Sequence, residues 1–362
     1  MRRRRGWKPL WTRWIRPRVY RTGRRPSRPR GNRREPLELD GTDKGMDVGE
    51  QELLTAIGKV LSGAGPEVLV GVGDDAAVVR PGPGDLVITT DAMVEGTHFD
   101  STFTSARDLG YKAVVVNLSD IAAMGASPRS AVCALTLTDA VDAAWTMELF
   151  GGMREACDEH ALWMVGGNLA RGREITVAVT VIGEAAPGRA VTRSGAQVGD
   201  AVVVTGSLGG SAAGLRIAAG FATSWSSDER GALDQHFRPV ARVGEGQALA
   251  HAGATAMIDI SDGLSLDLSR LCRASRVAVN IHASSIPVHP AATLDQALAG
   301  GEDYELLATV APAAVVSLTA DLMERFGTRL SVIGEIGPGA GLKIEDAAGR
   351  RELDPAGWDH FA

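Results

Sequence analysis

The chain has 362 residues, of which 44% are hydrophobic and 44 are glycine, and its net charge is −6. This length and apolar content predict a globular, enzyme-sized protein with two domains. No run of about 18 apolar residues occurs, so a membrane-spanning helix is excluded and a soluble, cytoplasmic protein is expected.

The first 45 residues differ from the rest of the chain. They hold sixteen basic residues against four acidic ones, whereas residues 46–362 have a balance of −18. They are rich in Arg, Pro and Gly without a helical or alternating pattern, which predicts a disordered leader. A nucleic-acid-binding arm and a transit peptide are the alternatives. We favour the leader, which need not be part of the working protein, because Met46 directly precedes a helical pattern. We therefore expect no nucleic-acid partner.

Residues 46–186 are predicted to form the first globular domain. Stretches with helical periodicity alternate with short apolar runs, so the domain is expected to combine a mixed sheet with helices. The pattern predicts helices at 50–61, 105–124 and 143–160, and strands at 68–71, 76–79, 86–90, 130–137, 162–165 and 174–184.

Residues 187–362 are predicted to form a second α/β domain, and their first part, residues 187–200, has the composition of a linker. Two related α/β domains that share a cleft would fit this order. The predicted elements are strands at 201–205, 256–258, 277–281 and near 330 and 343, helices at 210–220, 240–251, 263–274 and 312–326, and an irregular polar segment at 222–236.

The three cysteines carry no sign of a disulfide framework or a metal site. Cys133, Cys157 and Cys272 lie in a strand-like and two helix-like stretches without CxxC spacing. Core thiols in a reducing compartment are therefore expected.

Acidic residues recur in apolar, Gly-rich surroundings, where a carboxylate needs a compensating cation. Hard divalent metals are the usual cation for such oxygen ligands, so the pattern points to a polyanionic substrate. Structural roles are the alternatives: a turn, a buried Asp satisfied by Ser119, or an N-cap formed by Ser261 or Asp262. The acidic stretches are Gly73-Asp74-Asp75-Ala76-Ala77, Thr89-Thr90-Asp91, Asn117-Leu118-Ser119-Asp120 and Asp259-Ile260-Ser261-Asp262-Gly263.

Missing motifs narrow the chemistry further. The chain has no P-loop and no Gly-x-Ser-x-Gly, and it has only seven His. The Gly-rich stretch 206–211 lacks a P-loop Lys, so a scaffold role is expected for it. A reaction whose acceptor is itself a phosphate oxygen needs no general base, only charge neutralisation between two polyanions.

Taken in order, these segments resemble the thiamine-monophosphate kinase family, within the superfamily that includes aminoimidazole ribonucleotide synthetase and selenophosphate synthetase. The resemblance covers about residues 50–361. Single motifs recur across the superfamily, whereas Glu-Gly-Thr-His-Phe together with the terminal Gly-Trp-Asp-His-Phe is far more selective. The matching segments are residues 71–77, 90–99, 112–126, 258–264, 300–306 and 357–361.

The resemblance implies a two-domain aminoimidazole ribonucleotide synthetase-like fold of the α/β (α+β) class. It implies ATP-dependent phosphorylation of thiamine monophosphate to thiamine diphosphate by direct in-line transfer, with several Mg²⁺ ions and a K⁺ requirement. Residues 46–186 would bind ATP and metals and form a homodimer, and residues 187–362 would complete the ATP and thiamine phosphate site.

The resemblance also implies roles for individual residues. Asp120, Asp262 and Arg193 would be catalytic, and Gly167, Asn168, Arg193 and Ser261 would bind ATP. His98, Glu302 and Trp358 would meet thiamine monophosphate, although Trp358 can also be a core aromatic. The metal ligands would be Asp75, Thr89, Thr90, Asp91, Asp120, Asn168, Asp259 and Asp262.

Asn168 departs from the family pattern, which commonly has Asp in the corresponding place. A carbonyl oxygen can still ligate Mg²⁺ but brings one negative charge less. Weaker metal binding or a rearranged site is therefore expected at Asn168.

Two other functions are compatible with parts of the sequence. The first is that of another ATP-using member of the superfamily, of the selenophosphate or aminoimidazole ribonucleotide synthetase type. Selenophosphate synthetase would carry a reactive Cys or selenocysteine near its N-terminus, and no Cys precedes Cys133 here. A non-catalytic relative that binds nucleic acid through its Arg-rich arm is the other, and the intact set of aspartates argues against it.

Overall fold

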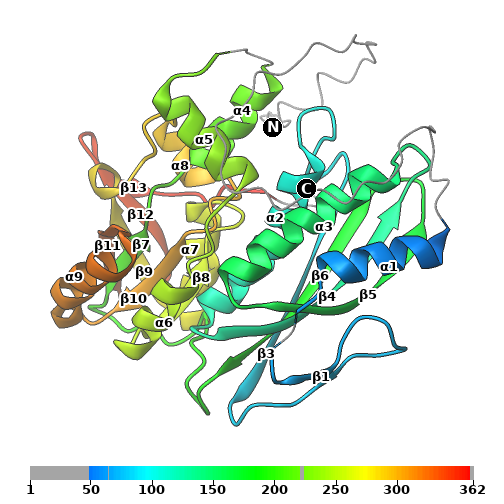
Figure 1. Cartoon of the computed structure of the whole chain (residues 1–362). Coiled ribbons are helices and arrows are strands. Elements are labelled where there is room, and N and C mark those ends of the chain that lie inside the picture. Colours follow the sequence, from blue (N-terminus) through cyan, green and yellow to red (C-terminus); the bar gives the residue numbers. More distant parts are fainter. Residues whose placement is uncertain (1–48, 64, 221–223, 359–362) are drawn as a thin grey trace, which may run out of the picture. The chain divides into compact units, whose positions relative to one another are not determined.

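The computed structural model describes residues 49–63, 65–220 and 224–358 (Figure 1). The predicted leader, residues 1–45, lies outside the described residues. Two larger sheets organise the described chain, a four-stranded sheet in its first half and a seven-stranded sheet in its second half. This arrangement confirms the expected α/β class.

The elements of the first half agree with the predicted ones. A small hairpin, β1–β2, precedes the four-stranded sheet, whose order is β3-β6-β4-β5. The bounds are α1 (Glu50–Val60), β1 (Val68–Val70), β2 (Val78–Val79), β3 (Asp85–Val94), α2 (Ala106–Ala123), β4 (Ser127–Leu137), α3 (Ala143–Glu159), β5 (Trp163–Arg171) and β6 (Thr176–Ala185).

Helix α2 is the central element of this half. It carries apolar residues around its whole circumference, as expected of a helix that is buried on all sides. It packs against α3 and against strands β3 and β6 of the four-stranded sheet (Figure 1). It also contacts α6 (Val243–His251) and β8 (Ala256–Asp259) of the second half. Side chains on α2 can therefore meet groups from both halves.

Among the described residues, helices cover one face of the four-stranded sheet and leave the other face uncovered. Val177, Val179 and Val181 of β6 are fully buried beneath α2. Because side chains alternate along a strand, neighbouring residues point to the other face. There Ile88 of β3 is 65% exposed and Val132 of β4 is 37% exposed. This second face therefore presents apolar side chains to solvent.

The seven-stranded sheet has the order β13-β12-β9-β11-β7-β10-β8. Strands β7, β8 and β10 are buried along their full length, so they read as continuous apolar runs. The remaining bounds are β7 (Ala201–Thr205), α4 (Gly210–Ala219), α5 (Ser227–Phe237), α7 (Leu264–Ser275), β9 (Ala278–His282), α8 (Leu294–Ala299), β10 (Leu306–Val310), α9 (Val315–Phe326), β11 (Leu330–Gly337), β12 (Gly341–Asp346) and β13 (Gly349–Glu352).

The prediction of an irregular segment at 222–236 was wrong for most of its length. Residues 227–237 form helix α5, which begins with a capping box between Ser226 and Glu229. The helix is polar, and among its residues only Ala232 and His236 are buried, so its apolar periodicity is weak. The capping pair is the local signal that predicts the helix start. No helix in the described part of the chain is long and apolar enough to cross a membrane.

Candidate active site

Carboxylates from α2 and β8 lie close together at the centre of the candidate site. The hydroxyl of Thr89 on β3 donates to Asp120 Oδ2 over 2.5 Å, and Ser119 donates to Asp259 Oδ2 over 2.7 Å. Asn117, one turn before Asp120, accepts a hydrogen bond from the Asp91 amide over 3.0 Å. Asn117 and Asp120 therefore share the face of α2 that meets β3.

The electrostatics of this cluster show a shortage of positive charge. Burial raises the pKa of Asp259 to about 8, and the nearby charges of Asp120 and Asp91 push it in the same direction. Burial also raises the pKa of Asp120, while the Thr89 hydrogen bond and the charge of Arg193 oppose the rise. Several carboxylates therefore face one another with Arg193 as a nearby cation, an environment that favours hard divalent metal ions.

The β8–α7 junction contributes a second group of acids. Arg270 Nη1 lies 2.5 Å from Asp262 Oδ2 and 2.6 Å from Asp267 Oδ1. Asp267 also accepts hydrogen bonds from the amides of Asp262 and Gly263. Capping by Ser261 or Asp262 was the structural alternative, but Gly263 is the N-cap and has no side chain to bond the first turn. The Asp262 carboxylate therefore does not cap the helix and pairs with Arg270 instead.

The carboxylates of this site do not form a finished metal cage in this conformation. Within residues 49–63, 65–220 and 224–358, no group of three or more His, Cys, Asp or Glu side chains converges closely enough to hold a metal ion. Oxygens of Asp120 and Asp262 are instead occupied by Thr89 and Arg270. The donor set suits Mg²⁺ in its chemistry, since all its members are oxygen ligands.

Four of the expected site residues lie away from this cluster. Asp75 is exposed between β1 and β2, where its amide bonds to Asp74. Thr90 points to the uncovered face of the sheet, where it accepts from Thr180 over 3.0 Å. Asn168 lies on the same face, because Ala92 pairs with Ala178, Ala178 with Ala134, and Ala134 with Asn168 across the sheet. Gly167 precedes it on β5, in close contact with the backbone of β4. The roles of these four residues stay predictions.

Two of the residues expected to bind the acceptor attach to the β8–α7 junction. The amide of Glu302 donates to Ser261 O over 2.7 Å, and the amide of Trp358 donates to Asp262 O over 3.0 Å. His98 lies in the turn after β3, where its Nδ1 accepts from the Val94 amide over 3.1 Å. The last residues of the motif, Asp359, His360 and Phe361, lie outside the described residues.

The structure adds two residues that the sequence pattern did not single out. Lys112 of α2 is buried and lies 3.0 Å from Glu302, and His236 of α5 lies 3.5 Å from the same carboxylate. For Lys112 a signal exists, because a lysine within the apolar run Tyr111–Val116 must be buried with a partner. For His236 we find no local signal.

The Gly-rich stretch 206–211 serves as scaffold, as expected. The buried carboxylate of Asp303 accepts hydrogen bonds from the amides of Gly209 and Ser211 at the start of α4. These amides are therefore not free for a phosphate group.

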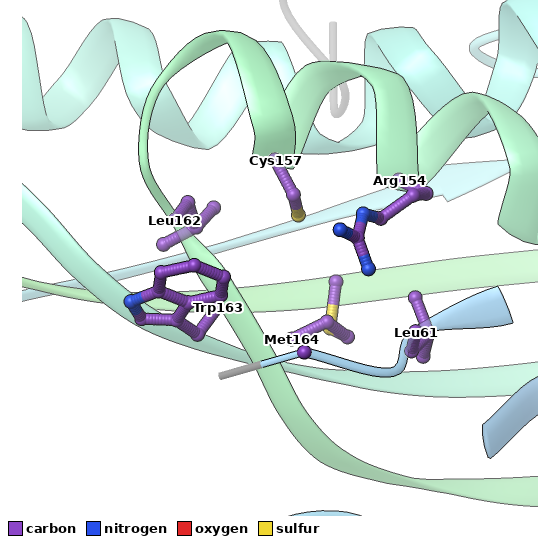
Figure 2. Close-up of a pocket in the computed structure, with 7 residues that line it drawn as sticks. Leu61, Arg154, Cys157, Leu162, Trp163 and Met164 are labelled. Atoms are coloured by element: carbon purple, nitrogen blue, oxygen red, sulfur yellow. The ribbon is translucent and has the colours of Figure 1, made fainter. Parts of the chain in front are cut away.

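A small pocket lies elsewhere, between the end of α1, helix α3 and strand β5. Figure 2 shows Arg154 and Cys157 of α3 above Leu61 and Met164. Burial raises the pKa of Cys157 to about 12, so its thiol is unreactive. None of the predicted site residues lines this pocket.

Two family models match the chain. Residues 73–185 match the AIR synthase related protein, N-terminal domain, and residues 197–347 match the corresponding C-terminal domain. Thiamine-monophosphate kinase of Escherichia coli strain K12 is 37% identical over 332 residues, which cover 88% of this chain and 99% of the relative.

Solved structures agree with this result. The crystal structure of thiamine-monophosphate kinase from Stenotrophomonas maltophilia K279a is 35% identical, has a TM-score of 0.72 and is matched over 77% of this chain and 92% of that one. AaThiL complexed with AMPPCP and TMP is 31% identical, with a TM-score of 0.69 and coverage of 86% and 97%. The expected two-domain fold is thereby confirmed.

Proposed function

The chain belongs to the thiamine-monophosphate kinase family, and we propose that it transfers the terminal phosphoryl group of ATP to thiamine monophosphate, giving thiamine diphosphate. The observation that carries the proposal is the pair Asp120 and Asp259, two carboxylates that meet from different halves of the chain through Ser119, the neighbour of Asp120, which donates to Asp259 Oδ2 over 2.7 Å. The charge of Asp120 adds to the rise in the pKa of Asp259. The relative bound to AMPPCP, an ATP analogue, and TMP supports the choice of both substrates.

Magnesium ions are part of the proposal. Asp91, Asp120, Asp259 and Asp262 would hold them, with Asp75, Thr89, Thr90 and Asn168 as further predicted ligands. Bound Mg²⁺ would neutralise the charge that develops on the transferring phosphoryl group. The family resemblance adds a K⁺ requirement, which we retain as a prediction.

The chain's own groups would orient the reactants. The charge of Arg193 opposes the rise in the pKa of Asp120, which supports a role for its guanidinium in clamping ATP phosphates. Gly167 and Ser261 are the further predicted ATP contacts. The acceptor oxygen of thiamine monophosphate is already anionic, so transfer in line needs no general base. Asp120 and Asp262 would act through charge and position.

Thiamine monophosphate would be bound by His98, Glu302 and Trp358. The Trp358 amide donates to Asp262 O, a contact that supports this role. Its indole would gain about 0.5–2 kcal/mol from a cationic thiazolium ring over its face.

We also propose a homodimer in a reducing compartment, the cytoplasm. The uncovered face of the four-stranded sheet exposes Leu86 and Ile88 of β3 and Val132 of β4, and a second copy of this face would bury them. Free, buried Cys133, Cys157 and Cys272 support the reducing compartment.

The test is an assay of the purified full chain with ATP, Mg²⁺ and one acceptor at a time: thiamine monophosphate, thiamine or an aminoimidazole precursor. ADP and thiamine diphosphate should form in equal amounts with thiamine monophosphate alone, and removal of Mg²⁺ by a chelator should stop both. Turnover of thiamine but not of its monophosphate would overturn the assignment.

A further inference from the structure

Lys112 is a buried cation that joins the two halves of the chain. Its side chain is 4% exposed, and its ammonium forms an ion pair with Glu302, at 3.0 Å from Oε1. A buried ammonium is costly unless it is paired and hydrogen-bonded. Lys112 stands on α2, whereas Glu302 stands in the loop between α8 and β10, so this ion pair spans the two halves.

The Glu302 backbone is held in an uncommon conformation. Its φ is 67°, in the left-handed region, and Tyr304 two residues later has a φ of 52°. Hydrogen bonds from the Glu302 amide to Ser261 O and from the Tyr304 amide to Ile260 O fix the loop against the β8–α7 junction. Strained positions of this kind persist where the surroundings impose them, and they cluster at functional sites.

His236 lies on the other side of the carboxylate. Its Nδ1 lies 3.5 Å from Glu302 Oε2 and 2.9 Å from Ser211 Oγ, and its side chain is 5% exposed. Burial lowers the pKa of His236 well below its usual value, and the charge of Lys112 adds a smaller effect in the same direction. The imidazole is therefore neutral, and Lys112 supplies the positive charge for Glu302.

Glu302 is thus held by its backbone hydrogen bonds and by Lys112, with His236 beside it, but it is not closed off. The Glu302 side chain is 26% exposed, so part of the carboxylate remains open to a ligand. An anion with a fixed orientation beside a binding site selects N–H donors or cations in its ligand.

We propose that Lys112 and His236 are positioning residues, which orient the Glu302 carboxylate so that it can bind N–H donors of the acceptor substrate. The proposal rests on the proposed function, because it takes Glu302 as a contact of thiamine monophosphate. It makes Lys112, on the N-terminal half, a determinant of acceptor affinity and not of ATP affinity.

The experiment is a double-mutant cycle of Lys112→Met and Glu302→Gln, with steady-state kinetics for each substrate and calorimetric binding of thiamine monophosphate without ATP. Lys112→Met should raise the KM and Kd for thiamine monophosphate by about tenfold. The KM for ATP should stay within about twofold, and in the Glu302→Gln background Lys112→Met should change acceptor affinity by less than about twofold. His236→Gln should raise the KM for the acceptor in the same selective way.

The matched control is Lys343→Met, which removes an exposed lysine that lies 3.6 Å from Glu352. It should leave all constants unchanged. If Lys112→Met fails to fold, the double variant, which has no unpaired charge, is compared with Glu302→Gln, and equal acceptor affinity is expected.

An equal loss of acceptor affinity in both backgrounds would overturn the proposal, as would a loss of stability without a change in KM. A wild type that binds thiamine monophosphate but does not turn it over would refute the proposed function, while the Kd values still decide the role of Lys112. A wild type that does not bind it would overturn both.

Discussion

At the residue scale, the carboxylates of the site contact partners that a ligand could replace. Thr89 bonds to Asp120, and Arg270 pairs with Asp262. Asp259 is buried, and its contact is the Ser119 hydroxyl, which brings no positive charge. The carboxylates therefore keep an unmet demand for cations, which is the property that a metal-dependent phosphoryl transfer needs.

Asp120→Asn is expected to lower kcat by at least about a hundredfold, because it removes charge from a site that acts by neutralising phosphates. The fold should persist, since Asn can still accept the Thr89 hydrogen bond. Turnover and a thermal melt of the same sample check this. Asp321→Asn, on the exposed surface of α9, is the control. Near-normal turnover in Asp120→Asn would remove the residue from the site.

The buried His236 should make the protein sensitive to acid. Its pKa is lowered in the folded state, so below pH of about 6.5 the unfolded chain takes up a proton that the folded chain does not. Its stabilising contribution is present above that pH and falls as pH drops, by at most about 1.4 kcal/mol per pH unit.

Denaturant titrations between pH 7 and pH 5 test this sensitivity. His236→Gln should unfold with a shallower pH dependence than the wild type. His160 and His289, whose pKa values are also lowered by burial, contribute with the same sign in both proteins. Equal slopes in both proteins would show that His236 is not the source.

At the element scale, α2 reaches its central place through close packing with α3. A side chain at Gly110 would collide with the Leu149 carbonyl, and one at Gly152 would collide with the Arg107 carbonyl. Small residues at this crossing bring the two backbones together, and that distance sets the position of Asp120 relative to β3 and β8.

Gly110→Ala is expected to destabilise the fold by about 2 kcal/mol or more, because backbone must move to admit the methyl group. Gly58→Ala on α1 is the matched control, since its Cβ would meet only ordinary contact at 3.7 Å. Alanine favours a helix over glycine, so this control should be neutral or stabilising by up to about 1 kcal/mol. Urea denaturation of both variants decides the matter, and equal effects would contradict the packing argument.

At the scale of the whole molecule, the uncovered face of the four-stranded sheet is the proposed contact between two copies. Ile88→Asp would place a charge within that contact and should weaken dimerisation by more than about tenfold. Light scattering across a concentration series measures the mass. Val316→Asp, at an 81% exposed position on α9, should leave the wild-type mass unchanged. A wild type that stays monomeric at all concentrations would contradict the homodimer.

The sequence by itself determined the order of most helices and strands, but it missed α5, α8, β10 and β13. It identified Asp91, Asp120 and Asp259 as site candidates. These conclusions rest on local patterns: apolar periodicity, and carboxylates in stretches that cannot be solvated. Helix α5 was missed because few of its side chains are buried, so its sequence lacks a clear apolar periodicity.

Only the tertiary structure decided which candidates meet. Strand register placed Thr90 and Asn168 on the opposite face of the sheet from Asp120, since neighbouring residues on a strand point to opposite sides. Packing of α2 between the halves paired Lys112 with Glu302, two residues 190 positions apart in the chain. Such pairs follow from how buried elements fit together, so a pattern read along the chain cannot supply them.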